Sequence, residues 1–465
     1  MSKKYNITSE YFVISGSTIK PESLIVYFPL KSMVFNVNPE AAELLERIKT
    51  KGEPSYICYL HTEETFLDQL EKMGLLNGPE DVIPDLPYDS KPQPTRTILL
   101  LSDRCSLKCI YCYKDASIHG DLMPLKIAEA TIDFIFYNAQ RLNEKIVEVG
   151  FHGGGEPTLN WPVFTSSIIY TREKCKSTDI HSQITLCTNG IMSEEQARWV
   201  AENIDNIAVS LDGPPDIHNR QRPFASGRDS FQDVAKTLNF FDKINKKYSV
   251  RMTATELTDG RLPEIYQFIV ENFKPHTVCI EPLYICGRCE TSHCKPPAKE
   301  SFIHDMEGVY ELARGKYRVL PYYSGNRVWG LTTRFCGASG SNFFVTPQGL
   351  VTSCLEISDL ANPKSDLFLY GKYNTSSEIF EFDIEKYHRL TQLRVHNFKE
   401  CASCFIKWHC GGDCLSKTPD INTIAIERNK YRCELNKSLS LGNLLQQMKY
   451  QIEETTQKET NNLST

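Results

Sequence analysis

The chain has 465 residues, of which 41% are hydrophobic and 24% charged, and its formal net charge is −6. These values are ordinary for a soluble globular protein of about three domains, and the mixed charges indicate neither nucleic acid nor a membrane as a partner. No apolar run reaches the roughly 18 residues of a spanning helix, and the N-terminus lacks the apolar core of a signal peptide. We therefore expect a cytoplasmic protein.

Cysteine is the unusual residue, since the chain contains 17. The cytosol keeps thiols reduced, so clustered cysteines there indicate metal binding and not a disulfide framework. Isolated thiols can instead act as small buried hydrophobic side chains. That interpretation fits Cys58, Cys175, Cys187 and Cys279, whereas the remaining cysteines occur in tight groups.

Residues 1–76 are predicted to form a small α/β unit, and residues 77–94, with five prolines, a semi-rigid linker. The unit begins with two strands, residues 23–29 and 33–37. A helix then follows Asn38, with an apolar face at helical spacing and Gly52 beyond its end. A second helix is predicted from about residue 62 to 73, ended by Gly74.

Residues 95–300 alternate between strand and helix patterns, which predicts a parallel sheet or barrel. Six strands fall short of the eight of a closed barrel, so the predicted fold class is α/β with a partial, open barrel. Such a barrel has a cleft along the C-terminal edge of its strands. The predicted strands are residues 97–101, 146–151, 184–187, 207–211, 250–255 and 278–282.

Residues 301–440 are predicted to form a metal-dependent region, because from about residue 330 the sequence has little apolar surface to bury. One hairpin is expected there, formed by residues 342–345 and 350–354. Residues 441–465 should form a C-terminal helix and a polar tail that frays from Glu453.

Cys105, Cys109 and Cys112 follow the first barrel strand with the spacing C-x₃-C-x₂-C. Three thiolates on one loop can hold three irons of a cubane cluster, and one iron then stays open for another ligand. A zinc site would need a fourth ligand, which makes zinc the weaker interpretation. This loop resembles the signature of the radical S-adenosylmethionine (SAM) superfamily.

The resemblance implies that SAM chelates the open iron and is split into methionine and a 5′-deoxyadenosyl radical, which abstracts a substrate hydrogen. Residues 151–157 resemble the family's GGEP motif, in which glycines allow close backbone approach and a carboxylate holds the methionine amino group. No catalytic acid or base is identified. The SAM contacts that the resemblance implies are Tyr111, Gly154, Gly155, Glu156, Pro157, Asn189, Ser210 and Arg222.

The later cysteines resemble the seven-cysteine SPASM pattern. That resemblance implies two auxiliary 4Fe–4S clusters, and therefore three 4Fe–4S clusters in all. The outer cluster would be ligated by Cys401, Cys404, Cys410 and Cys433, and the inner one by Cys336, Cys354 and Cys414.

The inner cluster lacks a fourth cysteine, because residues 326–335 contain none where some relatives have one. Its open iron could bind a substrate thiolate, or Cys286, Cys289 or Cys294 could fill it. The CGRCETSHC loop that carries these three fits a metal or redox role as well as incidental surface thiols. Glu356, close to Cys354, is a position worth mutating.

The strand and helix order of residues 1–76 resembles the winged-helix-like domains by which ribosomal-peptide maturases bind a leader peptide as an extra strand. We therefore expect a radical SAM/SPASM maturase that oxidises a precursor peptide, forming a thioether or a carbon–carbon crosslink. Its reductant would be flavodoxin- or ferredoxin-like. A sulfatase-maturation (formylglycine-generating) enzyme, which would not need residues 1–94, and an iron–sulfur electron carrier or sensor remain alternatives.

Overall fold

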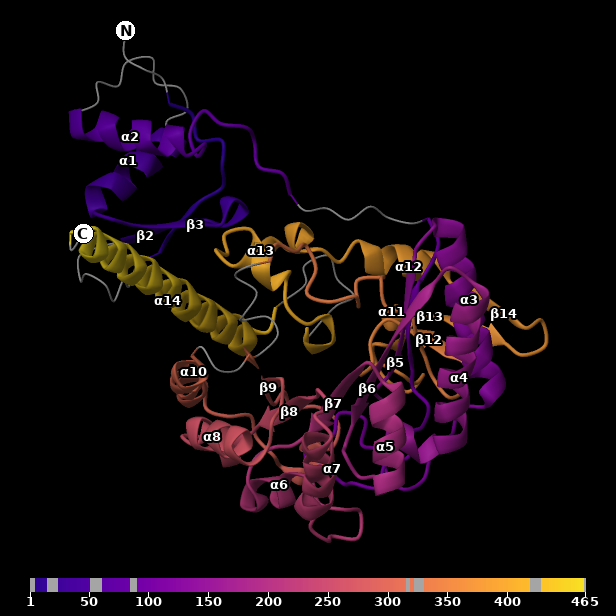
Figure 1. Ribbon diagram of the computed structural model, residues 1–465. Coiled ribbons are helices and arrows are strands. Elements are labelled where there is room, and N and C mark those ends of the chain that lie inside the picture. Colours follow the sequence, from indigo (N-terminus) through magenta and orange to yellow (C-terminus); the bar gives the residue numbers. More distant parts are fainter. Residues whose placement is uncertain are drawn as a thin grey trace.

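The computed structural model describes residues 5–14, 24–50, 61–83, 90–314, 318–321, 330–418 and 428–463. Within these ranges lie a sheet of three strands and a sheet of eleven. Figure 1 shows the smaller sheet and its helices above the larger one. Gly52, Cys58 and part of the segment 326–335 fall outside the described residues. None of the described helices is long and apolar enough to cross a membrane.

The N-terminal unit contains the predicted strand pair and both predicted helices. An antiparallel sheet of order β1-β2-β3 is formed by Phe12–Ile14, Leu24–Phe28 and Met33–Val37. It is followed by α1 (Pro39–Thr50) and α2 (His61–Lys72). The Asn38 side chain accepts a hydrogen bond from the Ala41 amide at 3.0 Å, as a helix cap does. The three-residue strand β1 was not predicted.

Both faces of this small sheet are covered. Phe28 and Val37 pack with residues of α1 and α2, such as Leu45. On the opposite face, Tyr27 packs against Leu444 of the C-terminal helix α14 (Lys430–Leu463), which runs beneath the sheet in Figure 1. The strand edges are therefore the parts of the sheet that can take another strand.

The predicted partial barrel is confirmed. Six parallel strands lie in chain order, and α-helices connect them on the outer side (Figure 1). The strands are β4 (Arg96–Leu99), β5 (Ile146–Phe151), β6 (His181–Thr188), β7 (Asn206–Ser210), β8 (Ser249–Ala254) and β9 (Thr277–Pro282). The helices are α3 (Leu125–Leu142), α4 (Trp161–Ser177), α5 (Glu194–Asn203), α6 (Pro215–Gln221), α7 (Phe231–Lys243) and α8 (Leu262–Asn272).

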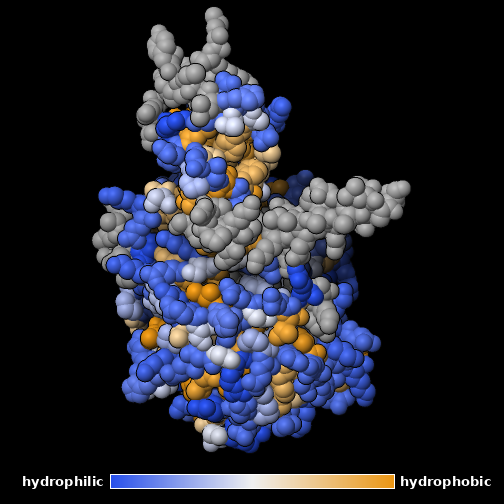
Figure 2. Space-filling model, turned by 90° about the vertical axis from the view of Figure 1, so that its left-hand side faces the viewer, coloured by the Kyte–Doolittle hydropathy of each residue, from blue (hydrophilic) through white to orange (hydrophobic). Residues whose placement is uncertain are grey.

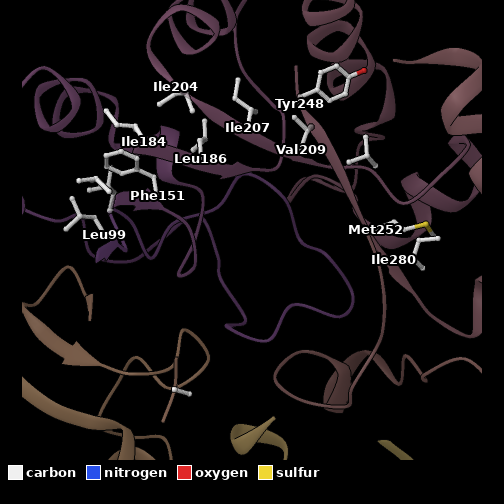
Figure 3. Packing of buried hydrophobic residues seen from close by; sticks show 14 of the residues in the cluster. Leu99, Phe151, Ile184, Leu186, Ile204, Ile207, Val209, Tyr248, Met252 and Ile280 are labelled. Atoms are coloured by element: carbon white, nitrogen blue, oxygen red, sulfur yellow. The ribbon is translucent and has the colours of Figure 1, made fainter. Parts of the chain in front are cut away.

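The hydrophobic core lies between these strands and their helices. Apolar side chains at alternate strand positions are buried there, and Figure 3 shows part of this core, from Leu99 on β4 to Ile280 on β9. Successive strand residues point to opposite faces, so the residues between them face the inside of the barrel. Those residues are polar in several strands, for example Cys187 and Arg251.

The large sheet continues beyond the six predicted strands on both sides. On one side β10 (Arg318–Pro321) pairs in parallel with β9, after α9 (Cys289–Ser292) and α10 (Lys299–Ala313). The predicted barrel end at residue 300 thus falls inside α10, which packs on α8 through an apolar face. On the other side β11 (Phe344–Val345) pairs with β4, and the Leu100 amide bonds to the Val345 carbonyl at 2.9 Å.

The predicted hairpin is present as β11 and β12 (Leu350–Thr352), and two unpredicted strands, β13 (Leu369–Asn374) and β14 (Ile379–Phe382), extend it. Short helices follow: α11 (Ser365–Phe368), α12 (Ile384–Thr391) and α13 (Lys407–Cys410). Helix α14 continues to Leu463, through the polar stretch from Glu453, and the fraying predicted there stays a prediction. Its last turns are rich in Gln, Lys and Glu, which favour helix even though they are polar.

Candidate active site and cluster sites

The loop after β4 brings Cys105, Cys109 and Cys112 together. Burial, together with repulsion from neighbouring thiols, raises the pKa of Cys105 to about 11 and that of Cys109 to about 12. The loop is anchored to the barrel by the amides of Lys108 and Ile110, which bond to the carbonyls of Pro223 and Gln221 at 2.7 and 3.0 Å. Iron binding to such thiols replaces their protons, which relieves this unfavourable arrangement.

Arg288 clamps the outside of this loop. Its guanidinium donates to the carbonyls of Cys109 and Ala116 at 2.9 and 2.5 Å and to the Asp115 carboxylate at 2.6 Å. Its own amide bonds to the Cys112 carbonyl at 2.9 Å. Arg288 is 6% exposed, so the CGRC loop supports the cysteine loop from behind. The sequence did not indicate this role, because no local pattern shows which backbone an arginine will meet.

The glycines of the GGEP-like motif meet the protein's own cysteine loop. The Gly155 amide bonds to the Ser102 carbonyl at 2.6 Å, and the Glu156 amide to the Arg104 carbonyl at 2.7 Å. A Cβ atom on Gly155 would lie 1.9 Å from the Arg104 carbonyl oxygen, and Gly154 has a φ of +64°. Pro157 then begins a short 3₁₀ helix. The glycines are therefore needed to hold the cysteine loop against β5.

Glu156 joins this motif to the end of β6. Its Oε1 accepts hydrogen bonds from the hydroxyls of Thr158 and Thr188, both at 2.8 Å, and its Oε2 accepts the Asn189 amide at 2.7 Å. Burial raises the pKa of this carboxyl. Asn189 also reaches the cysteine loop, with its Nδ2 3.7 Å from the Cys105 sulfur. Oε2 keeps a lone pair for an ammonium group such as that of SAM.

Tyr111 and Arg222 form a second contact point at the loop. Arg222 Nη1 donates to the Tyr111 hydroxyl at 2.6 Å, and that hydroxyl donates to Asp212 at 2.5 Å. Asp212 and Arg222 are buried, so this pair is rigidly placed. Ser210, the last residue of β7, lies beside Arg251 on the inner side of the barrel. All the expected SAM contacts thus lie at the C-terminal edge of the sheet.

The structure also gathers the later cysteines in two sets. Cys401, Cys410 and Cys433 each lie within electrostatic range of Cys404, and they raise one another's pKa by repulsion. Cys354 is partly exposed and lies within electrostatic range of Cys336 and Cys414. Burial raises its pKa most, followed by repulsion from Glu356 and from these two thiols. These are the same two sets that the SPASM resemblance implies.

Cys289 and Cys294 lie apart from the inner set. They pack with Leu283, Ile110 and Tyr111 beside the SAM-cluster loop. Cys286 accepts a hydrogen bond from Lys417 Nζ at 3.2 Å, and the same Nζ lies 2.7 Å from the Glu356 carboxylate. The Lys417–Glu356 pair therefore stands between Cys286 and the thiols of the inner set.

Across the described ranges, no group of three or more His, Cys, Asp or Glu side chains is close enough to hold one metal ion. In an iron–sulfur cluster each thiolate binds a different iron, so its ligands stand further apart than those of a single ion.

Comparison with known proteins agrees with this chemistry. Residues 99–269 match the model of the Radical SAM superfamily. This part of the chain is thus a radical SAM domain, and the protein is a radical SAM enzyme. The superfamily implies SAM and a 4Fe–4S cluster at Cys105, Cys109 and Cys112.

The chain is similar to a sulfatase-maturating enzyme. The Cysteine-type anaerobic sulfatase-maturating enzyme of Clostridium perfringens is 25% identical over 358 residues, which are 71% of this chain and 91% of the relative. The structure of native anSMEcpe with bound AdoMet and Kp18Cys peptide matches at a TM-score of 0.58 and 23% identity, over 76% of this chain and 98% of that one.

A third similarity covers more of the chain. The crystal structure of Streptococcus suis SuiB bound to precursor peptide SuiA matches at a TM-score of 0.53 and 14% identity, over 92% of this chain and 99% of that one. Because identity to both solved structures is so low, each shows the shared fold alone.

Proposed function

We propose that the protein is a peptide maturase, which oxidises a residue of a ribosomally made precursor peptide and binds the peptide's leader at residues 1–76. SAM on the Cys105–Cys112 cluster supplies the radical that removes a substrate hydrogen. Two auxiliary clusters, at the outer and inner cysteine sets, would take up the electron, and a flavodoxin- or ferredoxin-like protein would reduce the SAM cluster. The bond formed would be a thioether or a carbon–carbon crosslink.

The observation that carries the proposal is the open edge of β3. In the described part of the chain, β3 pairs with β2 on one side only, and both faces of its sheet are covered. The Oδ1 atom of Asn36 on β3 is buried and has no hydrogen-bond partner among the described residues. A peptide added as a further strand would supply backbone donors there.

Surface hydrophobicity at this unit supports the same conclusion. Figure 2 shows hydrophobic residues between hydrophilic ones on the upper part of the molecule. Val13 on β1 is 38% exposed, and Val82, which follows the unit, is 85% exposed. Because β1 is the edge of the sheet opposite β3, Val13 would remain free for another part of the bound peptide.

The N-terminal unit is also fastened to α13, which carries one of the outer cysteines, Cys410. Glu10 accepts hydrogen bonds from Lys407 Nζ and Trp408 Nε1, both at 2.5 Å. Tyr27 bonds to His409, the neighbour of Cys410. A leader bound at β3 would therefore have a fixed position relative to the cluster sites.

The test is an anaerobic reaction with a synthetic peptide encoded beside the gene for this protein. We expect 5′-deoxyadenosine together with a peptide mass loss corresponding to a pair of hydrogens. A leaderless version of the peptide should react much more slowly, and free leader should inhibit. Asn36→Ala should weaken leader binding, with Asn272→Ala on α8, far from the N-terminal unit in Figure 1, as the matched control. Formation of 5′-deoxyadenosine without any change in the peptide would reject the proposal.

A sulfatase-maturation activity is the second candidate, and the match over 91% of the Clostridium perfringens enzyme favours it. Its substrate would be a short cysteine peptide taken from a sulfatase, without any leader. Conversion of that peptide to an aldehyde at the rate of the best precursor peptide would favour this candidate.

A further inference from the structure

A group of titratable side chains that belongs to none of the cysteine sets lies on the inner side of the barrel. Arg251 on β8 is central: its Nη1 lies 3.8 Å from the sulfur of Cys187 on β6 and 3.5 Å from Nε2 of His152, which follows β5. Cys279 is the direct neighbour of Arg251 on β9. Its thiol lies 3.9 Å from Glu281.

This arrangement corrects the interpretation of Cys187 and Cys279 as isolated hydrophobic thiols. Their strands alternate, so Leu186 and Ile280 take the core positions and the two cysteines face inward. A charged arginine in the middle of β8 was the available sequence signal. This arginine alone does not predict the group, because the sequence does not show which neighbouring strands bring their polar residues to the same place.

The group adjoins the expected SAM contacts. His152 directly precedes the glycines of the GGEP-like motif, and Cys187 directly precedes Thr188, which bonds to Glu156. Tyr113 of the SAM-cluster loop lies within electrostatic range of Cys187, and also of Cys112 and Cys354. Cys187 therefore shares the neighbour Tyr113 with the SAM-cluster loop and with the inner cysteine set.

The two thiols beside Arg251 differ in their protonation state. Burial by itself raises the pKa of Cys187, but His152 and then Arg251 outweigh burial and bring that pKa to about 6. Burial and Glu281 raise the pKa of Cys279 to about 12. At neutral pH Cys187 is therefore a thiolate and Cys279 a thiol. Both are partly exposed.

We propose that Cys187 is the catalytic base of the barrel interior and takes the proton from a cysteine thiol of the peptide substrate, with Arg251 and His152 as positioning residues. One proton moves from the substrate sulfur to the Cys187 sulfur, and neither sulfur changes its oxidation state. The negative charge passes to the substrate sulfur and stays beside Arg251. The inference rests on the proposed function, and a substrate cysteine is common to thioether formation and cysteine-type maturation.

The state of Cys187 can be measured without activity. The full-length protein, with its clusters, is treated briefly and anaerobically with iodoacetamide at a series of pH values. Alkylation of each cysteine is then read by mass spectrometry. We expect the rate at Cys187, relative to Cys175 on α4, to reach half its maximum near pH 6. Arg251→Met and His152→Gln should each shift this midpoint to higher pH. The proton concentration at the midpoint should fall at least tenfold in each variant.

A wild-type midpoint in the ordinary thiol range, about 8.5, would overturn the proposal, as would an unchanged midpoint in both variants. These results do not depend on the identity of the peptide.

The second arm measures turnover with the substrate peptide. A positioned base contributes about 100-fold or more, so Cys187→Ser and Cys187→Ala should lower product formation by at least that factor and still form 5′-deoxyadenosine. Cys175→Ser is the matched control and should react at the wild-type rate. Product at the wild-type rate from Cys187→Ala would overturn the inference while leaving the proposed function intact. If wild-type protein gives no product, the proposed function fails, and the alkylation profile still decides the state of Cys187.

Discussion

The barrel and the segment 395–418 both hold sets of cysteines, but they are stabilised in different ways. Between Arg96 and Pro282 the fully buried side chains are mostly apolar, and the buried charges Glu156, Asp212 and Arg222 stand at the SAM motifs. The segment 395–418, with the start of α14, has helices of only three or four residues before α14. It also buries several charged side chains, namely Asp413, Lys417, Arg428 and Arg432.

This difference indicates that the two regions depend on their clusters for folding to different degrees. The barrel can fold around its apolar core, so its folding does not require a cluster on the cysteine loop. In the later segment the thiols and ion pairs are themselves a large part of the interior, so metal binding contributes to folding there. Removing cysteines should therefore affect chemistry in the first case and structure in the second.

The largest effect is expected from changing all three loop cysteines to alanine. The variant with Cys105, Cys109 and Cys112 replaced should form no 5′-deoxyadenosine above background, because the SAM cluster is lost. Its strands β4 to β9 should keep wild-type protection from hydrogen exchange.

The contrasting variant replaces Cys401, Cys404 and Cys410. It should lose exchange protection in residues 395–418 and retain it in the barrel. If both regions lost protection equally, or if neither lost protection, the two regions would not differ in how far their folding depends on metal.

Gly155→Ala tests how closely the barrel holds its cysteine loop. The new Cβ would meet the Arg104 carbonyl oxygen at 1.9 Å, and backbone on both sides leaves little room to adjust. We expect a loss of about 2–4 kcal/mol in the free energy of unfolding, read from denaturant melts, and weaker SAM binding. Gly442→Ala, where nothing lies within 4 Å of the new Cβ, is the control and should not destabilise the protein.

The buried pair of Arg432 and Asp413 tests the later segment. Arg432 donates to both carboxylate oxygens, at 2.7 and 2.9 Å. Arg432→Met removes both of these charged hydrogen bonds from the buried Asp413 carboxylate, so we expect a loss of about 3 kcal/mol in that segment by hydrogen exchange. Lys145→Met, which removes an exposed ion pair with Asp179, should leave the melting temperature unchanged.

The same pair has a defined pH dependence. Burial raises the pKa of Asp413, but Arg432 outweighs burial and lowers that pKa below its usual value. Its contribution to stability is therefore fully present above the unfolded pKa, about 3.9, and is lost as the pH falls through the lower folded value. Arg432→Met should weaken this acid dependence. A variant with an unchanged acid transition would show that the pair does not stabilise the segment.

The smallest effect is expected where the segment 395–418 meets the N-terminal unit. Glu10→Ala removes the bonds to Lys407 and Trp408. Each such bond contributes about 1 kcal/mol, so the unit should exchange and be cleaved by protease faster while SAM cleavage without peptide stays normal. Wild-type protease resistance would mean that Tyr27 and Leu444 alone hold the unit in place.

The sequence predicted the parts of the molecule that local patterns determine. Strand and helix periodicity gave β4 to β9, and cysteine spacing gave three sets of thiols that the structure brings together. Contacts between distant segments could not be predicted from the sequence. Pairing of β11 with β4, the clamp of Arg288 on the cysteine loop, and the meeting of Cys187 with Arg251 all depend on which strands become neighbours. No local pattern reports that.

The most direct test counts iron and sulfide per chain in anaerobically reconstituted protein. Each cubane holds about four irons, so wild-type protein should contain about 12, and the variant without Cys105, Cys109 and Cys112 about eight. That result would establish one SAM cluster and two auxiliary clusters. A wild-type total of about four would contradict the account, because the later cysteines would then form no clusters.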